Sequence, residues 1–421
     1  MTEKVNCITP DCDAMILPET AERTGGLCMP CQREQQQQAE RAYIEANRQD
    51  IDPYAGLTDP VEIIKQRHVQ RPFNKLIRYA DYQGDITTVY QQLTQPQVEA
   101  LIAHDIARHQ AGDNDYFDDL SLELAAFSQG DLSQLQHYLV QNHADAPALI
   151  FRGAEPAMTQ ILLDRIEQYR TDRGELNNLL CALAWIGTAQ VVEQFAAWRA
   201  APPAWAELLY CPPWQYAHEA GWELNANDQR RNLYFDACYP LTLTANRSGH
   251  YAFTTASTPC PQCQHPLTTM LGVDLTAPEC RFLPFDGDVL ALKNCQVCSC
   301  FGGDGLFTRI GVEDANCWLA TDTKMQEDDW ELAPVSYFNL GQQRPAWFAA
   351  HEFLSATTQS QLGGLPAWVQ DTDYPCCPQC QHTMTFVAQI SRAETDEYGE
   401  GMHYLFVCSS CQLSTANYQQ T

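Results

Sequence analysis

The sequence is short of basic residues and has no long hydrophobic run. It carries 25 Lys and Arg against 53 Asp and Glu, a formal net charge of −28. A surface of this sign repels the phosphate backbone of nucleic acids and attracts basic partners. The stretch 179–187 is among the longest apolar runs, and it falls well short of the roughly 18 to 20 residues that span a bilayer. We therefore expect no membrane segment, and we consider nucleic-acid binding unlikely on charge alone.

The start of the sequence shows no export signal. Glu3 and Lys4 stand where a signal peptide would begin, and no long apolar segment follows them. The chain nevertheless contains 19 Cys. In a protein that is not exported, cysteine of this abundance favours metal ligation in the reducing cytoplasm over disulfide bonds. We expect a cytoplasmic location.

Familiar catalytic motifs are also missing. Residues 259–263 match one half of the zinc deaminase signature, but the H-x-E half is absent and His218-Glu219 has the wrong spacing for it. The same dipeptide lacks the second His of H-E-x-x-H. There is no P-loop lysine, since the Gly-rich stretch 302–305 is acidic and predicted to be a turn, and there is no G-x-S-x-G elbow. We expect a protein that is not an enzyme.

Paired cysteines are the strongest positive signal. The hexapeptide Cys-Pro-Gln-Cys-Gln-His occurs at 260–265 and again, letter for letter, at 377–382. Each copy is followed by two strand-like segments, and the second segment leads into another Cys-x-x-Cys pair. Two such pairs can place four thiolates tetrahedrally around Zn²⁺. The repeated order indicates an internally duplicated zinc ribbon.

The eight ligands predicted for these two sites are Cys260, Cys263, Cys295, Cys298, Cys377, Cys380, Cys408 and Cys411. When the two repeated segments are aligned, Cys377 corresponds to Cys260, and Cys376 is left as a thiol that is not a ligand. His265 and His382 directly follow the first Cys pairs and are expected to pack over the sites or to hydrogen-bond a thiolate. The alternative for each half is a pair of disulfides or a set of unligated thiols.

A third quartet lies near the start of the chain, at Cys7, Cys12, Cys28 and Cys31. Its spacing is that of a zinc site. Because so short a segment has almost no core, metal binding of about 10–16 kcal/mol would supply its fold. The alternative is a frayed segment with free thiols. We expect up to three structural Zn²⁺ ions, although spacing alone does not separate zinc from iron.

The remaining cysteines carry weaker expectations. Cys181, Cys211 and Cys238 are expected to be small buried hydrophobic residues. Cys300 and Cys317 are possible nucleophiles by residue type, but no neighbouring base is identifiable to activate them.

The fold class predicted is a multidomain α+β protein. Residues 1–50 form a zinc module with an exposed helical arm, 51–236 an all-helical domain, and 237–421 the β-rich duplicated zinc-ribbon domain. Apolar residues at helical spacing place helices at 95–110, 116–129, 132–141, 156–170, 176–186 and 189–199. Helix pairs joined by short turns suggest a HEAT-like solenoid, with a compact bundle as the alternative.

An acidic loop separates the two zinc halves. It contains Asp322, Glu327, Asp328, Asp329, Trp330 and Glu331. Such a run is commonly a solvated loop. It is also a candidate docking patch for a basic partner, because Trp is a good interface anchor.

Three motifs of the C-terminal part occur in a characteristic order. They are the Gly-Gly-Leu-Pro-Ala-Trp stretch within 361–371, the strand 386–390 that ends in Gln-Ile, and the Gly-rich turn and strand at 399–406. In this order they resemble the YwqG-like family of bacterial proteins. The resemblance covers about 340–421 well and 240–335 weakly. It implies no catalytic residues. Because some members lie beside polymorphic toxin genes, it implies a role as an immunity protein.

These observations favour an acidic, zinc-stabilised binding protein that neutralises a basic toxin domain by occlusion. One alternative is a zinc-ribbon adaptor associated with nucleic-acid machinery, which the charge opposes. The other is an enzyme with an unrecognised site.

Overall fold

The computed structural model describes residues 3–112, 117–143, 147–247, 249–300, 306–311, 318–319, 332–354 and 356–420. The chain divides into two compact units, Met1–Asp85 and Ile86–Thr421. Both helices and strands are present, so the expected mixture of the two is confirmed.

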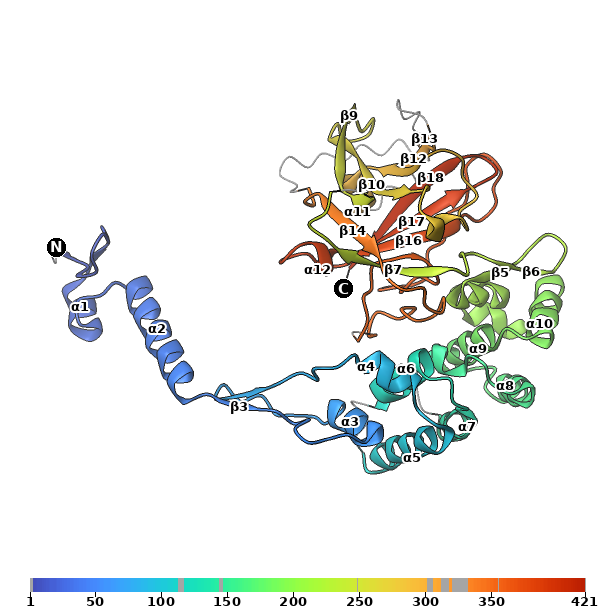
Figure 1. Cartoon of the computed structure of the whole chain (residues 1–421), viewed down its shortest axis with the longest axis horizontal. Coiled ribbons are helices and arrows are strands. Elements are labelled where there is room, and N and C mark those ends of the chain that lie inside the picture. Colours follow the sequence, from blue (N-terminus) through green and yellow to red (C-terminus); the bar gives the residue numbers. More distant parts are fainter. Residues whose placement is uncertain are drawn as a thin grey trace. The chain divides into compact units, whose positions relative to one another are not determined.

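The first unit begins with a small hairpin and two helices (Figure 1). Its elements are β1 (Val5–Asn6), β2 (Met15–Ile16), α1 (Pro18–Thr24), α2 (Met29–Asn47), β3 (Gln49–Ile51), α3 (Pro60–Arg67) and β4 (Ile77–Tyr79). β1 pairs with β2 antiparallel, and β3 pairs with β4 parallel. The whole of α2 lies in the described part, and none of its side chains is buried, as expected for an exposed arm.

The second unit begins with helices. They are α4 (Ile86–Gln91), α5 (Gln95–Gln110), α6 (Phe117–Phe127), α7 (Ser133–Asn142), η1 (Ala148–Phe151), α8 (Pro156–Gln168), α9 (Arg173–Ile186), α10 (Ala189–Ala200), η2 (Ala204–Leu208) and η3 (Pro213–Ala220). Six of them coincide with predicted helices to within a few residues, because their apolar residues recur at helical spacing. In α6 every residue from Leu120 to Phe127 is buried. In α9, the Asp172 carboxylate accepts from the backbone amide of Glu175 at 3.1 Å, and Gly187 ends the helix at φ 54°.

The expectation that 51–236 is all-helical is wrong at three short strands. β4 lies in this range, and β5 (Trp222–Leu224) pairs with β6 (Arg230–Asn232). The segment between β5 and β6 is rich in Asn and Asp, which favour turns, and Asp228 there has φ 57°. Trp222 anchors the hairpin, since its indole Nε1 donates to the carbonyl oxygen of Ala184 at 2.9 Å.

The rest of the second unit is dominated by β-structure. Its elements are β7 (Cys238–Leu243), β8 (His250–Ala252), β9 (Thr254–Pro259), β10 (Pro266–Asp274), η4 (Pro278–Cys280), β11 (Val289–Asn294), α11 (Gln296–Cys300), β12 (Leu306–Arg309), β13 (Trp318–Leu319), β14 (Ser336–Leu340), β15 (Gln361–Gly363), β16 (Thr385–Ser391), α12 (Arg392–Thr395), β17 (Met402–Cys408) and β18 (Leu413–Gln419).

All of these strands belong to one antiparallel sheet. Its order is β11-β10-β8-β14-β7-β15-β16-β17-β18-β12-β13, with β9 added on β10. The strands predicted to follow the first Cys pair of each half are β10 and β16. The strands predicted to lead into the second Cys pair are β11 and β17. The side-chain amide of Asn294, at the end of β11, donates to the carbonyl oxygen of Leu306 in β12 at 3.0 Å. The first strand of the path therefore lies beside β12, near the other end of the path, and the residues of the sheet contribute to three apolar clusters.

The Gly-Gly turn after β15 is required by close packing. Gly363 and Gly364 both have φ 73°. A Cβ atom on Gly363 would lie 1.9 Å from the carbonyl oxygen of Ala237. The turn leads to Ala367, whose backbone amide donates to the buried side-chain oxygen of Gln389 at 2.8 Å. This accounts physically for the Gly-Gly motif and for the Gln-Ile pair of β16.

Within the second unit, helices and sheet share packed contacts. The rings of Phe127 in α6 and Phe348 lie 4.6 Å apart. The guanidinium of Arg152 lies 4.1 Å from the ring centre of Trp347 and donates to the carbonyl oxygen of Ala125 at 2.7 Å. Among the helices that the structure describes, none combines the length and apolar character needed to cross a membrane.

Candidate metal centres

The structure brings each predicted cysteine quartet together. We call Cys7, Cys12, Cys28 and Cys31 centre 1; Cys260, Cys263, Cys295 and Cys298 centre 2; and Cys377, Cys380, Cys408 and Cys411 centre 3. In each centre the four sulfur atoms lie within 4.8 Å of one another. All three quartets could hold a metal ion.

The sulfur separations match tetrahedral coordination. The Sγ atoms of Cys260 and Cys298 are 3.7 Å apart, and those of Cys380 and Cys408 are also 3.7 Å apart. Zn–S bonds of about 2.3 Å in a tetrahedron place the sulfurs roughly 3.8 Å apart, whereas a disulfide bond is about 2.05 Å long. The described cysteines are all unpaired. The geometry therefore favours a metal over the disulfide alternative.

The same turn forms the first Cys pair of centres 2 and 3. In centre 3, the backbone amide of Cys377 donates to the carbonyl oxygen of His382 at 2.9 Å, and the amide of Gln381 donates to the carbonyl oxygen of Cys377 at 2.8 Å. Centre 2 repeats the first of these bonds between Cys260 and His265 at 2.6 Å. Each histidine thus fixes its turn through its backbone, and neither imidazole belongs to a quartet.

A glutamine with left-handed backbone closes three of the turns. Gln264, Gln381 and Gln412 follow the last Cys of their pairs and have φ of 68°, 60° and 55°. Each side-chain amide donates back to a carbonyl oxygen of its own turn, at 3.2, 3.0 and 2.5 Å respectively. The local bond offsets the cost of a conformation that glycine adopts more readily. The Cys-Gln dipeptide alone does not specify this feature, because Gln32 and Gln296 also follow cysteines but lie in the helices α2 and α11.

Centre 1 has little other than its sulfurs for a core. Cys7, Ile16 and Cys28 are the buried residues of its apolar cluster. A hydrogen bond with the Thr9 side chain, followed by one from the Cys28 backbone amide, lowers the pKa of Cys7 to about 6. A thiolate at neutral pH is the ligand form of cysteine.

The other predicted site residues lie apart from the three quartets. Cys376 is exposed and lies outside centre 3. The sequence predicts this, because Cys377 and not Cys376 aligns with Cys260 of the first half. Cys238 is buried, whereas Cys181 and Cys211 are half-buried. Burial raises the pKa of Cys300 to about 11, which disfavours a thiolate nucleophile there. Cys317 lies outside the described residues.

The acidic loop also falls outside the described residues. This applies to Asp322, Glu327, Asp328, Asp329, Trp330 and Glu331. The sequence reasoning missed a cavity beside centre 2, which is lined by α11 and by residues of the segment 392–420.

The three cysteine quartets found among the described residues define a protein with three candidate metal centres. The whole chain aligns with the uncharacterized protein YpfL of Salmonella typhimurium (strain LT2), at 37% identity over 433 aligned positions covering 100% of both chains. The chain therefore belongs to the same family as YpfL. No family model matches the chain, and no solved structure matches it.

Proposed function

We propose that this protein is a zinc-stabilised binding protein without a catalytic centre, and that its partner is a basic protein domain. The observation that carries the proposal is the closed donor set of each centre. Four cysteine sulfurs complete a tetrahedron and leave no position for water or substrate. Zn²⁺ held in this way supplies folding free energy and fixes the loops that carry its ligands.

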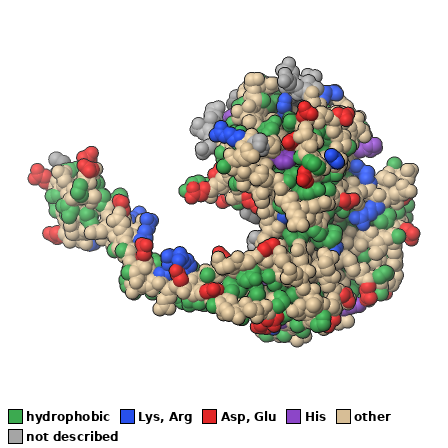
Figure 2. All heavy atoms as spheres, viewed as in Figure 1, with side chains coloured by type: hydrophobic (Ala, Val, Ile, Leu, Met, Phe, Trp, Pro, Cys, Tyr) green, Lys and Arg blue, Asp and Glu red, His purple; other side chains and the backbone are tan. Residues whose placement is uncertain are grey.

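The distribution of charge supports a basic partner. The second unit holds 39 of the 53 acidic residues and only 15 of the 25 basic ones. Figure 2 shows acidic side chains spread over the visible surface of this unit rather than gathered in one patch. A field of this sign accelerates encounter with a basic domain and disfavours nucleic acid.

Two finer features of the fold belong to the same proposal. The successive packing of α8 on α9 and of α9 on α10 supports a HEAT-like stack. The antiparallel pairs β10–β11 and β16–β17, each carrying two Cys pairs, support a duplicated zinc ribbon. A partner domain would be bound by the acidic surface and the concave side of such a stack.

The narrower form of the proposal is an immunity protein. In this role, acidic side chains cover the mouth of a toxin domain or take the place of its anionic substrate. The resemblance of 340–421 to the YwqG-like family supports this role, because some members of that family lie beside toxin genes. Neutralisation would then require only occlusion and no chemistry by this chain.

Affinity purification from the native host tests the proposal. A tagged chain should retain one basic protein in a stoichiometric complex, together with about three zinc ions per chain. The complex should re-form from the two purified proteins. Recovery of only nucleic acid and ribosomal proteins would contradict the proposal and favour the adaptor alternative.

The salt dependence of association tests the electrostatic component separately. Between low salt and 0.5 M NaCl, the association rate constant with the purified partner should fall steeply, while the dissociation rate constant should change much less. An association rate that is independent of salt would show that the acidic surface does not guide the encounter.

A further inference from the structure

A cavity of about 420 Å³ lies between the two halves of the sheet domain. Its lining includes Gln296 and Cys300 of α11, Arg392 and Asp396 at α12, His403 of β17 and Tyr418 of β18. The volume falls in the range of about 300–1,000 Å³ typical of small-molecule sites. Because α11 contains the ligand Cys298, centre 2 supports one wall of the cavity.

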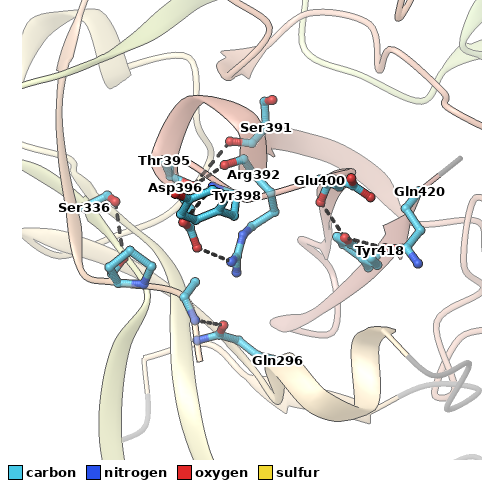
Figure 3. A network of polar contacts seen from close by, with 12 residues as sticks. Gln296, Ser336, Ser391, Arg392, Thr395, Asp396, Tyr398, Glu400, Tyr418 and Gln420 are labelled. Carbon is cyan, nitrogen blue, oxygen red and sulfur yellow. Dashed lines mark hydrogen bonds and ion pairs between the residues drawn. The ribbon is translucent and has the colours of Figure 1, made fainter. Parts of the chain in front are cut away.

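Arg392 provides a cation with unused hydrogen-bond donors. Its side chain is 13% exposed, and its Nη2 donates to Oδ2 of Asp396 at 3.0 Å. Its Nε is buried without a hydrogen-bond partner among the described residues. Figure 3 shows the guanidinium pointing into the space between Asp396 and Gln296. A guanidinium has five N–H donors arranged to bind planar carboxylates, so one aspartate leaves donors for a ligand oxygen.

Asp396 is already occupied by protein groups. While Oδ2 accepts from Arg392, Oδ1 accepts from the backbone amide of Tyr398 at 3.2 Å. The aspartate therefore orients Arg392 rather than binding a ligand itself. Both residues are half-buried. Because the charges of Arg392 and Asp396 offset each other, the pair alone does not define a site for a cation.

His403 lies against the same cavity as a neutral ring. Its side chain is buried, and its Nδ1 has no hydrogen-bond partner among the described residues. Burial, followed by the nearby Arg392, lowers the pKa of His403 to about 3. Its ring lies 4.7 Å from Tyr418 and 5.5 Å from Phe253. The inner wall is thus aromatic and uncharged.

The rim of the cavity carries an acid and a second tyrosine. Glu400 is exposed, and its backbone carbonyl accepts from the hydroxyl of Tyr418 at 2.5 Å (Figure 3). Tyr398 is 86% exposed. The Glu400 carboxylate and the overall charge of −28 oppose a ligand with net negative charge. A ligand with both a carboxylate and a cation avoids this repulsion.

We propose that this cavity binds a free amino acid as its zwitterion, with the carboxylate on Arg392 and the ammonium toward Glu400. The amino-acid side chain lies against the aromatic wall formed by His403 and Tyr418. The proposal is independent of any toxin partner, since it concerns a site for a small molecule.

Ligand-observed NMR and calorimetry on the full-length, zinc-loaded protein test the site. The probes are the twenty L-amino acids, followed by L-leucine, L-leucinamide and N-acetyl-L-leucine as a matched series. Leucinamide lacks the carboxylate and should bind about tenfold or more weakly than leucine, since a charge-assisted hydrogen bond is lost. N-acetyl-leucine lacks the ammonium and should also bind more weakly. Failure of all twenty to bind at millimolar concentration, or equal binding of leucine and leucinamide, would overturn the proposal.

Variants assign the two ends of the ligand. Glu400→Gln is at an exposed position. It should weaken the binding of leucine and leave the binding of N-acetyl-leucine unchanged. Arg392→Lys keeps the positive charge but loses the planar guanidinium with its paired N–H donors. It should therefore weaken the binding of both leucine and N-acetyl-leucine. Arg281→Lys, at an exposed arginine away from the cavity, is the matched control. If Arg392→Lys fails to fold, Glu400→Gln with the ligand series decides the matter, because unchanged leucine binding in that variant would contradict the proposal.

Discussion

The backbone amide of Cys377 donates a hydrogen bond to the carbonyl oxygen of His382 at 2.9 Å. Cys260 and His265 make the same contact in the other half of the sheet domain. The contact uses the backbone of each histidine, so the turn that presents two sulfurs does not depend on an imidazole. Any residue that fits the backbone geometry can therefore occupy these positions.

Replacing these histidines should leave the metal content unchanged. We expect His382→Ala and His265→Ala each to retain the zinc stoichiometry of the unmodified protein, measured by native mass spectrometry. Cys380→Ala is the positive control and should lose one ion, because it removes one of the four donors of centre 3. Loss of an ion from His382→Ala would instead show that the imidazole helps to hold the metal.

Removing a ligand from centre 1 should unfold the first unit locally. Because centre 1 has only three buried residues in its cluster, Cys28→Ser should abolish metal binding there and the protection of 3–31 in hydrogen exchange. The second unit should keep its melting temperature, since the two units are separately compact. Cys376→Ser changes an exposed thiol outside the quartets. It should alter neither the metal content of centre 1 nor the hydrogen-exchange protection of 3–31. A shared loss of stability would show that the two units fold together.

The left-handed glutamine of centre 3 allows a test of backbone strain. Gln381→Gly should be as stable as the unmodified protein or more stable by up to about 1 kcal/mol, because glycine adopts φ 60° without steric cost. Gln381→Val should lose about 1–2 kcal/mol, since a β-branched residue is strained there. Urea unfolding with excess zinc measures both. Gln379→Val, two residues earlier in the same turn, is the control and should have a smaller effect than Gln381→Val.

A half-buried carboxyl group should make stability depend on pH. Burial, followed by repulsion from Asp371, raises the pKa of Glu219 from 4.5 to about 7. The folded state therefore holds this proton more tightly than the unfolded state. The contribution of Glu219 to stability is present below pH 4.5 and is lost as the pH rises toward 7, by up to about 3 kcal/mol.

Glu219→Gln should remove this dependence. Relative to the unmodified protein, the variant should gain stability as the pH rises from about 4.5 to 7, measured as the difference between two urea unfolding curves at each pH. Taking the difference cancels the opposing effect of buried histidines such as His403. Glu207→Gln, at an exposed position in the helical part, should give a difference that is flat with pH. A flat difference for Glu219→Gln would contradict the raised pKa.

The twelve cysteines of the three centres could be predicted because the information is local. The two cysteines of each pair lie close together in the sequence, and the strands beside Cys263 and Cys295 are recognisable from their apolar residues. The helices were predictable for a similar reason, since their apolar faces repeat along the chain. Both kinds of signal concern residues that are close in sequence.

The order of the strands could not be predicted in this way. β7 pairs with β14 and β15, and Thr308 of β12 pairs with Ser414 of β18. No turn or spacing links strands so far apart in sequence. The cavity was missed because Gln296 and Cys300 of α11 lie far before the segment 392–420 that supplies its other residues. His403 reads as part of a buried strand, and no local pattern places α11 beside it.

The pairing of β12 with β18 also affects the synthesis of this protein. Roughly 100 residues separate the two strands, so at about 5–20 residues per second a ribosome needs about 5–20 s to supply the partner of β12. An unpaired strand edge is an aggregation hazard during that interval. All four sulfurs of centre 2 have been synthesised by then, because Cys298 precedes β12. Early capture of zinc by the growing chain would fix the β10–β11 hairpin before the strand that completes the sheet exists, so zinc supply during translation should determine how much of the newly made protein reaches its folded form.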